Sequence, residues 1–114
     1  MSECLQVVTT VPDQETASRL AQLLVDQRLA ACAQVLGPIR SVYRWQGNVE
    51  QAQEWLCLIK TTREAYPALE AAIRTHHPYE VAEIIATPIV EGNAAYLEWI
   101  RKEVGLSAGT LEQD

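Results

Sequence analysis

The chain has no phenylalanine and few other aromatic residues, with three tryptophans and four tyrosines among 114 residues. A core of aliphatic side chains is therefore expected. No stretch approaches the about 18 consecutive apolar residues that a membrane-spanning helix needs, so we expect no membrane segment. The first four residues, Met-Ser-Glu-Cys, are acidic and no apolar secretory run follows them, which predicts a cytoplasmic protein.

Basic charge is also scarce. Nine lysines and arginines stand against fifteen aspartates and glutamates, which gives a formal net charge of −6. Proteins that bind nucleic acids contact the phosphates with a basic surface, so this balance argues against a nucleic-acid partner. The segment 55–60 also lacks the basic, glycine-containing aromatic pattern of an RNA-recognition strand. An acidic protein is compatible with attracting metal cations.

The three cysteines, Cys4, Cys32 and Cys57, are odd in number, widely spaced and set among apolar neighbours. This pattern favours buried, reduced thiols over disulfides. No CxxC pair is present, which argues against a structural zinc site. Glycine-rich nucleotide-binding loops and the GxSxG motif of hydrolases are also missing, so we expect no enzymatic activity.

Hydrophobic periodicity predicts the element order β-α-β-β-α-β followed by a helix. This order is typical of an α+β, ferredoxin-like split βαβ fold, with both long helices on one face of a four-stranded antiparallel sheet. Residues 1–105 form a single domain in this interpretation, and 106–114 form a mobile tail. The expected elements are a strand over 5–10, a helix over 14–29, a strand over 32–45 with a kink at Gly37-Pro38, a turn with Gly47-Asn48 as its two-residue loop, a strand over 49–61, a helix over 66–76, a strand over 81–89 and a helix ending at Gly105.

Two of the expected strands are apolar on both faces, over 55–59 and 84–86. A sheet with one face in water alternates polar and apolar residues, so something must cover the second face. Because only a short helix remains unassigned, we expect another subunit to cover it. The long hairpin over 39–61 can extend past its own sheet and pair with the edge strand of a neighbour.

Six stretches, which together span about residues 5–104, resemble the CutA divalent-cation tolerance family. The resemblance implies a ferredoxin-like subunit in a tight homotrimer, an architecture similar to that of PII signalling trimers, and a role in tolerance of copper and other divalent metals. Some members carry a cysteine where Thr9 stands here, and in them that thiol joins two histidines in a proposed copper site. The matching stretches are Thr9–Asp13, Leu29–Cys32, Ser41–Gly47, Ile59–Thr61, His76–Ile84 and Gly92–Ile100.

The two histidines are the candidate metal ligands. His76 lies on the apolar stripe of the expected helix, so it is either a packed residue or a ligand. His77 is pushed into an extended conformation by Pro78. Adjacent side chains diverge on a helix and on a strand, so the pair needs further ligands, and Glu80 or Glu83 can add oxygen to an imidazole site for Cu²⁺. We favour His77 as the ligand, because His76 has the stronger claim to packing.

Lys60 and Glu83 are charged residues inside otherwise apolar strands. They either reach solvent at a rim or form a buried ion pair that lines a cleft between subunits. The remaining candidates for an interface or cleft are aromatic residues, which are either packing residues or a ligand cage. They are Tyr43, Trp45, Tyr79, Tyr96 and Trp99.

The sequence therefore predicts a non-catalytic, homotrimeric divalent-cation tolerance protein of CutA type. We expect it to bind divalent metal ions, with Cu²⁺ first. The alternative is a PII-like trimeric sensor or scaffold that binds a small anionic ligand in the clefts between subunits.

Overall fold

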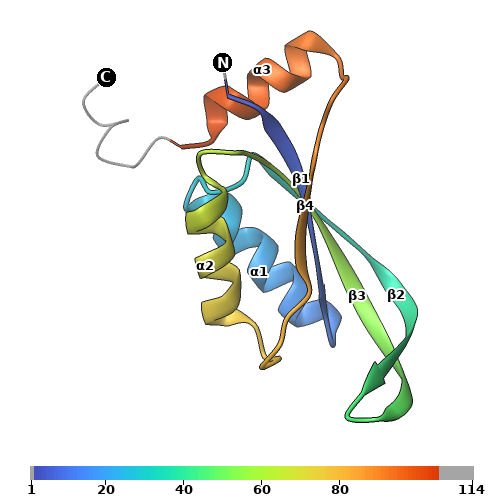
Figure 1. Cartoon of the computed structure of the whole chain (residues 1–114). Helices are drawn as coiled ribbons and strands as arrows, with labels where there is room; N and C mark the ends of the chain where they lie inside the picture. Colours follow the sequence, from blue (N-terminus) through green and yellow to red (C-terminus); the bar gives the residue numbers. More distant parts are fainter. Residues whose placement is uncertain (1, 106–114) are drawn as a thin grey trace.

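The computed structural model describes residues 2–105, and the expected mobile tail, 106–114, lies outside them. The chain forms four strands and three helices in the expected order (Figure 1), which confirms the α+β split βαβ fold. None of the helices within this described range is long and apolar enough to span a membrane. The elements are β1 (Cys4–Val11), α1 (Gln14–Asp26), β2 (Cys32–Trp45), β3 (Asn48–Thr62), α2 (Tyr66–His76), β4 (Ile84–Pro88) and α3 (Ala94–Glu103).

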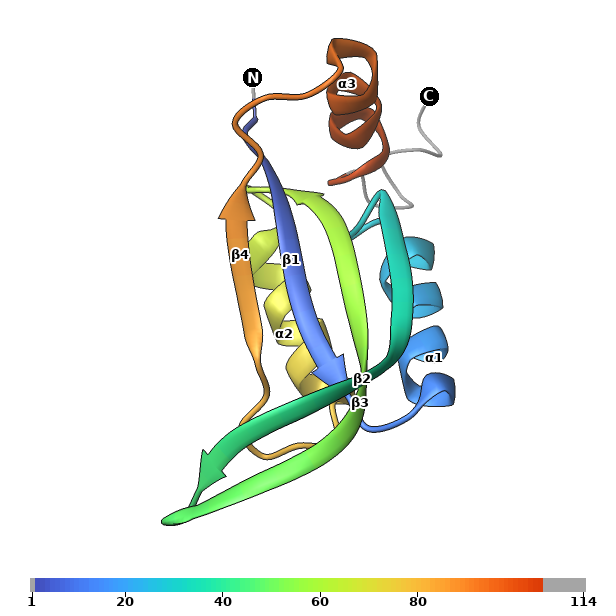
Figure 2. The same cartoon turned by 90° about the vertical axis from the view of Figure 1, so that its right-hand side faces the viewer.

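The strands form one antiparallel sheet in the order β2-β3-β1-β4. Helices α1 and α2 both lie on the same side of this sheet (Figure 2), as right-handed crossovers require. Between them and the sheet lies an aliphatic core, in which Val7, Leu24, Ile59 and Ile73 are fully buried. Helix α3 packs at one end of the sheet, where Ile100 and other buried residues form a second, smaller cluster.

Helix α1 begins as expected but ends earlier. The side chain of Asp13 caps its first turn by accepting a hydrogen bond from the backbone N–H of Thr16 at 2.7 Å. The helix ends at Asp26 rather than at residue 29, because Arg28 adopts the left-handed conformation with φ 58°. A glycine usually takes this position. Because an arginine stands there instead, the end of the helix could not be predicted from the sequence.

The hairpin of β2 and β3 projects beyond the rest of the sheet (Figure 2). The register shifts between Leu36 and Ile39, which confirms the expected irregularity at Gly37-Pro38. A side chain at Gly37 would collide with the ring of Trp55, because a Cβ atom there would lie 2.6 Å from it. Glycine thus allows Trp55 to pack closely over the bent strand.

The loop at the tip of the hairpin differs from our prediction by one residue. The two loop residues are Gln46 and Gly47, and Asn48 is already paired with Trp45 in the ladder. Both loop residues have positive φ, 50° and 84°, the geometry of the type I′ turns that join twisted antiparallel strands. The prediction of Gly47-Asn48 as the loop was therefore wrong.

The face of the sheet opposite the helices, which we call the open face, is apolar at its centre. Val8 pairs with Leu58 on one side and with Ile85 on the other, so the three side chains share this face. Leu36 and Ile85 are 56% and 55% exposed. The expectation of a second apolar face that the described part of the chain leaves uncovered is confirmed.

Candidate functional site

The segment 77–83 joins α2 to β4 and lies at the same end of the molecule as the hairpin (Figure 1). His77 anchors it. Nδ1 of His77 accepts a hydrogen bond from the backbone N–H of Tyr79 at 3.1 Å. Nε2 therefore carries the proton and donates to the carbonyl oxygen of Thr10 at 2.8 Å. Both ring nitrogens of this buried histidine are engaged with backbone atoms.

The burial of the two histidines is the reverse of what we predicted. His76 is the last residue of α2 and is exposed, whereas His77 is buried, with only 9% of its surface exposed. The reason is the end of the helix: His77 has extended dihedral angles, φ −87° and ψ 135°, which turn its side chain towards β1. The packing role that we gave to His76 was wrong. Of the two rings, only that of His76 is free of hydrogen bonds to the described residues.

Tyr79 and Glu54 form a second anchor for the same segment. The hydroxyl of Tyr79 donates to Oε2 of Glu54 at 2.8 Å, and Glu54 is 8% exposed. Burial, and after it the hydrogen bond to the carboxylate, raises the pKa of Tyr79 above its ordinary value of 10, so the phenol stays a donor. Sequence analysis did not single out Glu54, although a carboxylate directly before the apolar run 55–59 was a usable signal.

A cavity of about 670 Å³, which we call the hairpin cavity, lies between the hairpin and the segment 77–83. It brings together residues that the sequence analysis named separately: the rings of Tyr43, Trp45 and Tyr79 and the exposed carboxylates of Glu80 and Glu83. The other lining residues are Thr10, Ser41, Val42, Glu54, Pro78 and Val81. The strand that we predicted over 81–89 is shorter, because β4 covers only Ile84–Pro88. Val81 and Glu83 therefore belong to the segment 77–83 and line the cavity.

The other interface candidates lie elsewhere. The rings of Tyr96 and Trp99 contact each other on α3, with centroids 5.5 Å apart, at the end of the sheet opposite the hairpin (Figure 1). Neither residue lines the hairpin cavity.

The proposed pairing of Lys60 with Glu83 does not form in the chain as described. Nζ of Lys60 donates to Oε1 of Gln34 at 3.0 Å, and the salt bridges among residues 2–105 do not include Glu83. Lys60 lies opposite Gln6 in the sheet, whereas β4 begins opposite Thr9. Lys60 and Glu83 therefore lie at different positions along β1. Glu83 is exposed, which supports the solvated alternative for this residue.

The described residues contain no group of three histidine, cysteine or acidic side chains that can hold a metal ion. Thr9 is fully buried under the helices and does not line the hairpin cavity. The cysteines are all free: Cys4 and Cys57 are buried as expected, whereas Cys32 is partly exposed. Burial raises the pKa of the Cys57 thiol to about 11, which disfavours the thiolate that binds metals.

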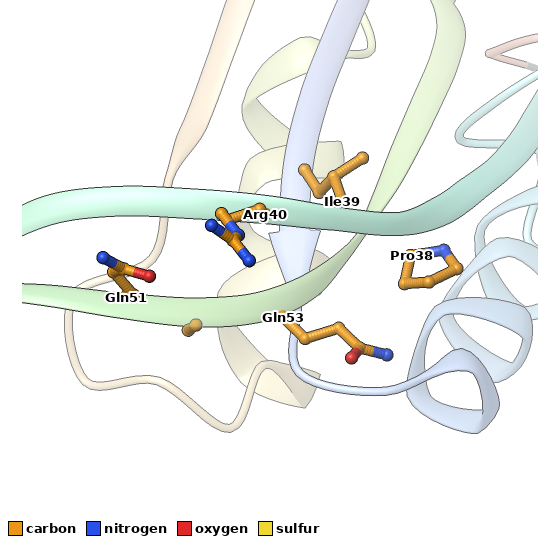
Figure 3. A pocket seen from close by; sticks show the side chains of 6 residues that line it. Pro38, Ile39, Arg40, Gln51 and Gln53 are labelled. Carbon is orange, nitrogen blue, oxygen red and sulfur yellow. The ribbon is translucent and has the colours of Figure 1, made fainter.

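A smaller hollow of about 370 Å³ lies on the hairpin itself (Figure 3). Arg40 and Gln51 project into it from neighbouring strands, and Arg40 is the charged residue among its described lining. One guanidinium among amide and aliphatic groups offers no acid, base or metal ligand. The remaining lining residues are Pro38, Ile39, Ala52 and Gln53.

Comparison with known proteins agrees with the resemblance seen in the sequence. The model of the family described as CutA1 divalent ion tolerance protein matches residues 5–103. The divalent-cation tolerance protein CutA of Thermus thermophilus is 48% identical over 99 residues, which cover 87% of this chain and 96% of that protein. Protein CutA of Homo sapiens is 44% identical over 93 residues, which cover 82% of this chain and 52% of the human protein. The chain thus spans about half the length of this human relative.

Solved structures give the same result. The divalent cation tolerance protein from Thermus thermophilus superposes with a TM-score of 0.88 at 47% identity, over 90% of this chain and 99% of that chain. CutA1 from Oryza sativa gives a TM-score of 0.89 at 39% identity, over 93% and 97% of the two chains. The family model covers nearly all of the described fold, and the chain belongs to the CutA1 divalent ion tolerance family.

Proposed function

We propose that this chain is a non-catalytic divalent-cation tolerance protein that binds divalent metal ions, with Cu²⁺ first, as a homotrimer in the cytoplasm. The family is named for ion tolerance rather than for a reaction. The net charge of −6 favours the approach of cations. The free cysteines are typical of a reducing compartment, although a rice relative is named as chloroplastic.

One observation carries the metal proposal: the ring of His76 is exposed and accepts no hydrogen bond from a described residue, and the segment that follows it carries the exposed carboxylates of Glu80 and Glu83. Imidazole and carboxylate together suit Cu²⁺. His77 acts in this proposal as the buried anchor of the segment rather than as a ligand, because both of its nitrogens are occupied.

The metal site is incomplete within one subunit. Three ligands do not converge anywhere in residues 2–105, so a neighbouring subunit or water must complete the coordination of an ion held by His76. The trimer is supported by the apolar open face, which water would otherwise cover. The anionic-ligand alternative has less support, because three glutamates and no described lysine or arginine line the hairpin cavity.

Calorimetric titration of Cu²⁺ into the wild type, His76→Ala and the neighbouring exposed variant Thr75→Ala tests the proposal. Loss of a ligand should weaken Cu²⁺ binding by at least about tenfold in His76→Ala, whereas Thr75→Ala should match the wild type. Light scattering and circular dichroism show whether each variant keeps its assembly and fold. Wild-type affinity and stoichiometry in a folded His76→Ala would overturn the assignment of His76.

A further inference from the structure

We propose that Tyr79 and Glu54 form a latch that fixes the direction in which the hairpin projects from the subunit. We call residues 39–53, the part of the hairpin beyond the end of β1, the arm. The use of the latch in assembly rests on the proposed homotrimer, because an arm that contacts a neighbouring subunit has to point towards it. The latch itself lies within a single chain.

The sheet leaves the arm without support. The ladder between β1 and β3 ends at the pair of Val11 and Trp55, and beyond that pair the two strands of the hairpin pair only with each other. None of the side chains of the arm is buried. A two-stranded hairpin with no core of its own is marginally stable at best in water. A contact from elsewhere is therefore needed to hold the arm in one direction.

A bend in β2 lies where the support ends. The register shifts between Leu36 and Ile39, so Gly37 and Pro38 together stand opposite Trp55. An extra residue of this kind bends a strand and increases its local twist. The pairing of β2 with β3 keeps the arm together past this bend, but it does not attach the arm to the rest of the subunit.

The latch lies at this bend. Glu54 is the first residue of β3 past the ladder with β1, and it is buried although no residue of the arm is. The hydroxyl of Tyr79 donates to its Oε2 at 2.8 Å. In the part of the chain that the structure describes, this is the one hydrogen bond that connects residues 39–54 with an element outside the hairpin. Hydrogen bonds to ionised groups are the stronger ones, so the bond suits this task.

Tyr79 is in turn held by the sheet. Its backbone N–H donates to Nδ1 of His77, and Nε2 of His77 donates to the carbonyl oxygen of Thr10 on β1. The rings of His77 and Tyr79 also contact each other, with centroids 4.9 Å apart. Contacts thus run without a gap from β1 to Glu54. An arm that is already fixed in direction loses less conformational freedom when a neighbouring subunit binds it.

Hydrogen exchange of the full chain, followed peptide by peptide by mass spectrometry, tests the latch. Tyr79→Phe removes the donor and Glu54→Leu removes the acceptor. Glu54→Gln keeps an oxygen that can accept from Tyr79, so it is the conservative variant. The matched control is Tyr66→Phe, which removes a phenol that lies beside Glu70 on α2, away from the arm.

We expect the amides of the arm to exchange at least about tenfold faster in Tyr79→Phe and in Glu54→Leu, because a bond to a charged group is lost. Amides of α1 should keep their wild-type rates in both variants. Exchange of the arm in Tyr66→Phe should match the wild type, and Glu54→Gln should stay closer to the wild type than Glu54→Leu.

Wild-type exchange of the arm in Tyr79→Phe would overturn the proposal. Equal acceleration in the arm and in α1 would also overturn it, because it would indicate general destabilisation. The same holds if Glu54→Gln exchanges as fast as Glu54→Leu. Failure of the homotrimer is seen separately, in the mass of the wild type: a monomer whose arm is loosened by Tyr79→Phe keeps the latch, and a trimer whose arm is unaffected loses it.

Discussion

The two faces of the sheet differ in how far their apolar side chains are buried. On the helix side, Val7, Ile59, Leu24 and Ile73 are fully buried by α1 and α2, so the chain satisfies this face by itself. On the open face, Leu36 and Ile85 remain more than half exposed although they are just as apolar. Residues 2–105 therefore cover one face of the sheet only. The open face is therefore available for contact with a partner, whereas the helix face stabilises the subunit itself.

The two neighbouring histidines repeat this contrast on a smaller scale. His77 has both ring nitrogens bonded within the chain, and His76 has neither bonded to a described residue. A side chain whose polar atoms form hydrogen bonds within the chain stabilises the fold, whereas a side chain without such bonds is available for a ligand. The following variants test whether this division holds.

The largest effect on subunit stability should come from the helix face. Leu24→Ala removes a fully buried side chain from the main core and should lower the free energy of unfolding by about 2–5 kcal/mol. Urea denaturation followed by circular dichroism measures it. The exposed residue Val25 is the matched control on the same helix, and Val25→Ala should cost much less. Equal losses for the two variants would contradict the division.

A smaller loss is expected at His77. His77→Ala leaves the carbonyl of Thr10 and the amide of Tyr79 without their partners in a buried setting, which should cost about 1–3 kcal/mol. His76→Ala, on the exposed neighbour, should stay within about 0.5 kcal/mol. The same denaturation experiment compares them. If the larger loss belonged to His76, the roles given to the two rings would be reversed.

The smallest effect is expected at Glu83. Because its carboxylate is exposed and forms no salt bridge with a described residue, Glu83→Ala should change the free energy of unfolding by less than about 0.5 kcal/mol. A loss of about 3 kcal/mol or more would instead indicate a buried ion pair that forms in the assembly.

Local patterns predicted the fold well, because hydrophobic periodicity and proline positions act over a few residues. The order of the elements and the irregularity at Gly37-Pro38 were readable in this way. The end of α1 was not, since an arginine occupies a position where glycine is the usual signal. The hairpin loop was misplaced because Gly47-Asn48 and Gln46-Gly47 are both compatible with a tight turn, and only the strand register separates them.

The candidate site was less predictable because its contacts connect distant parts of the chain. The hydrogen bond from Tyr79 to Glu54 spans 25 residues, and that from His77 to Thr10 spans 67. Pro78 correctly predicted that α2 ends at His76 and that His77 is extended, but local patterns did not show that the extended backbone turns the His77 ring towards Thr10. Sequence analysis named five of the eleven described lining residues of the hairpin cavity as candidates, but only the packing of the hairpin against the segment 77–83 shows that they meet.

If other copies of the chain cover the open face, sedimentation equilibrium at micromolar concentration should detect the assembly. The wild type should have three times the 12.7 kDa mass of one chain. Ile85→Asp, which places a charge on the open face, should lower that mass while the far-ultraviolet spectrum stays folded, and Ser18→Asp on the exposed side of α1 should leave it unchanged. A wild-type mass of 12.7 kDa, or a trimer that Ile85→Asp leaves intact, would contradict the account.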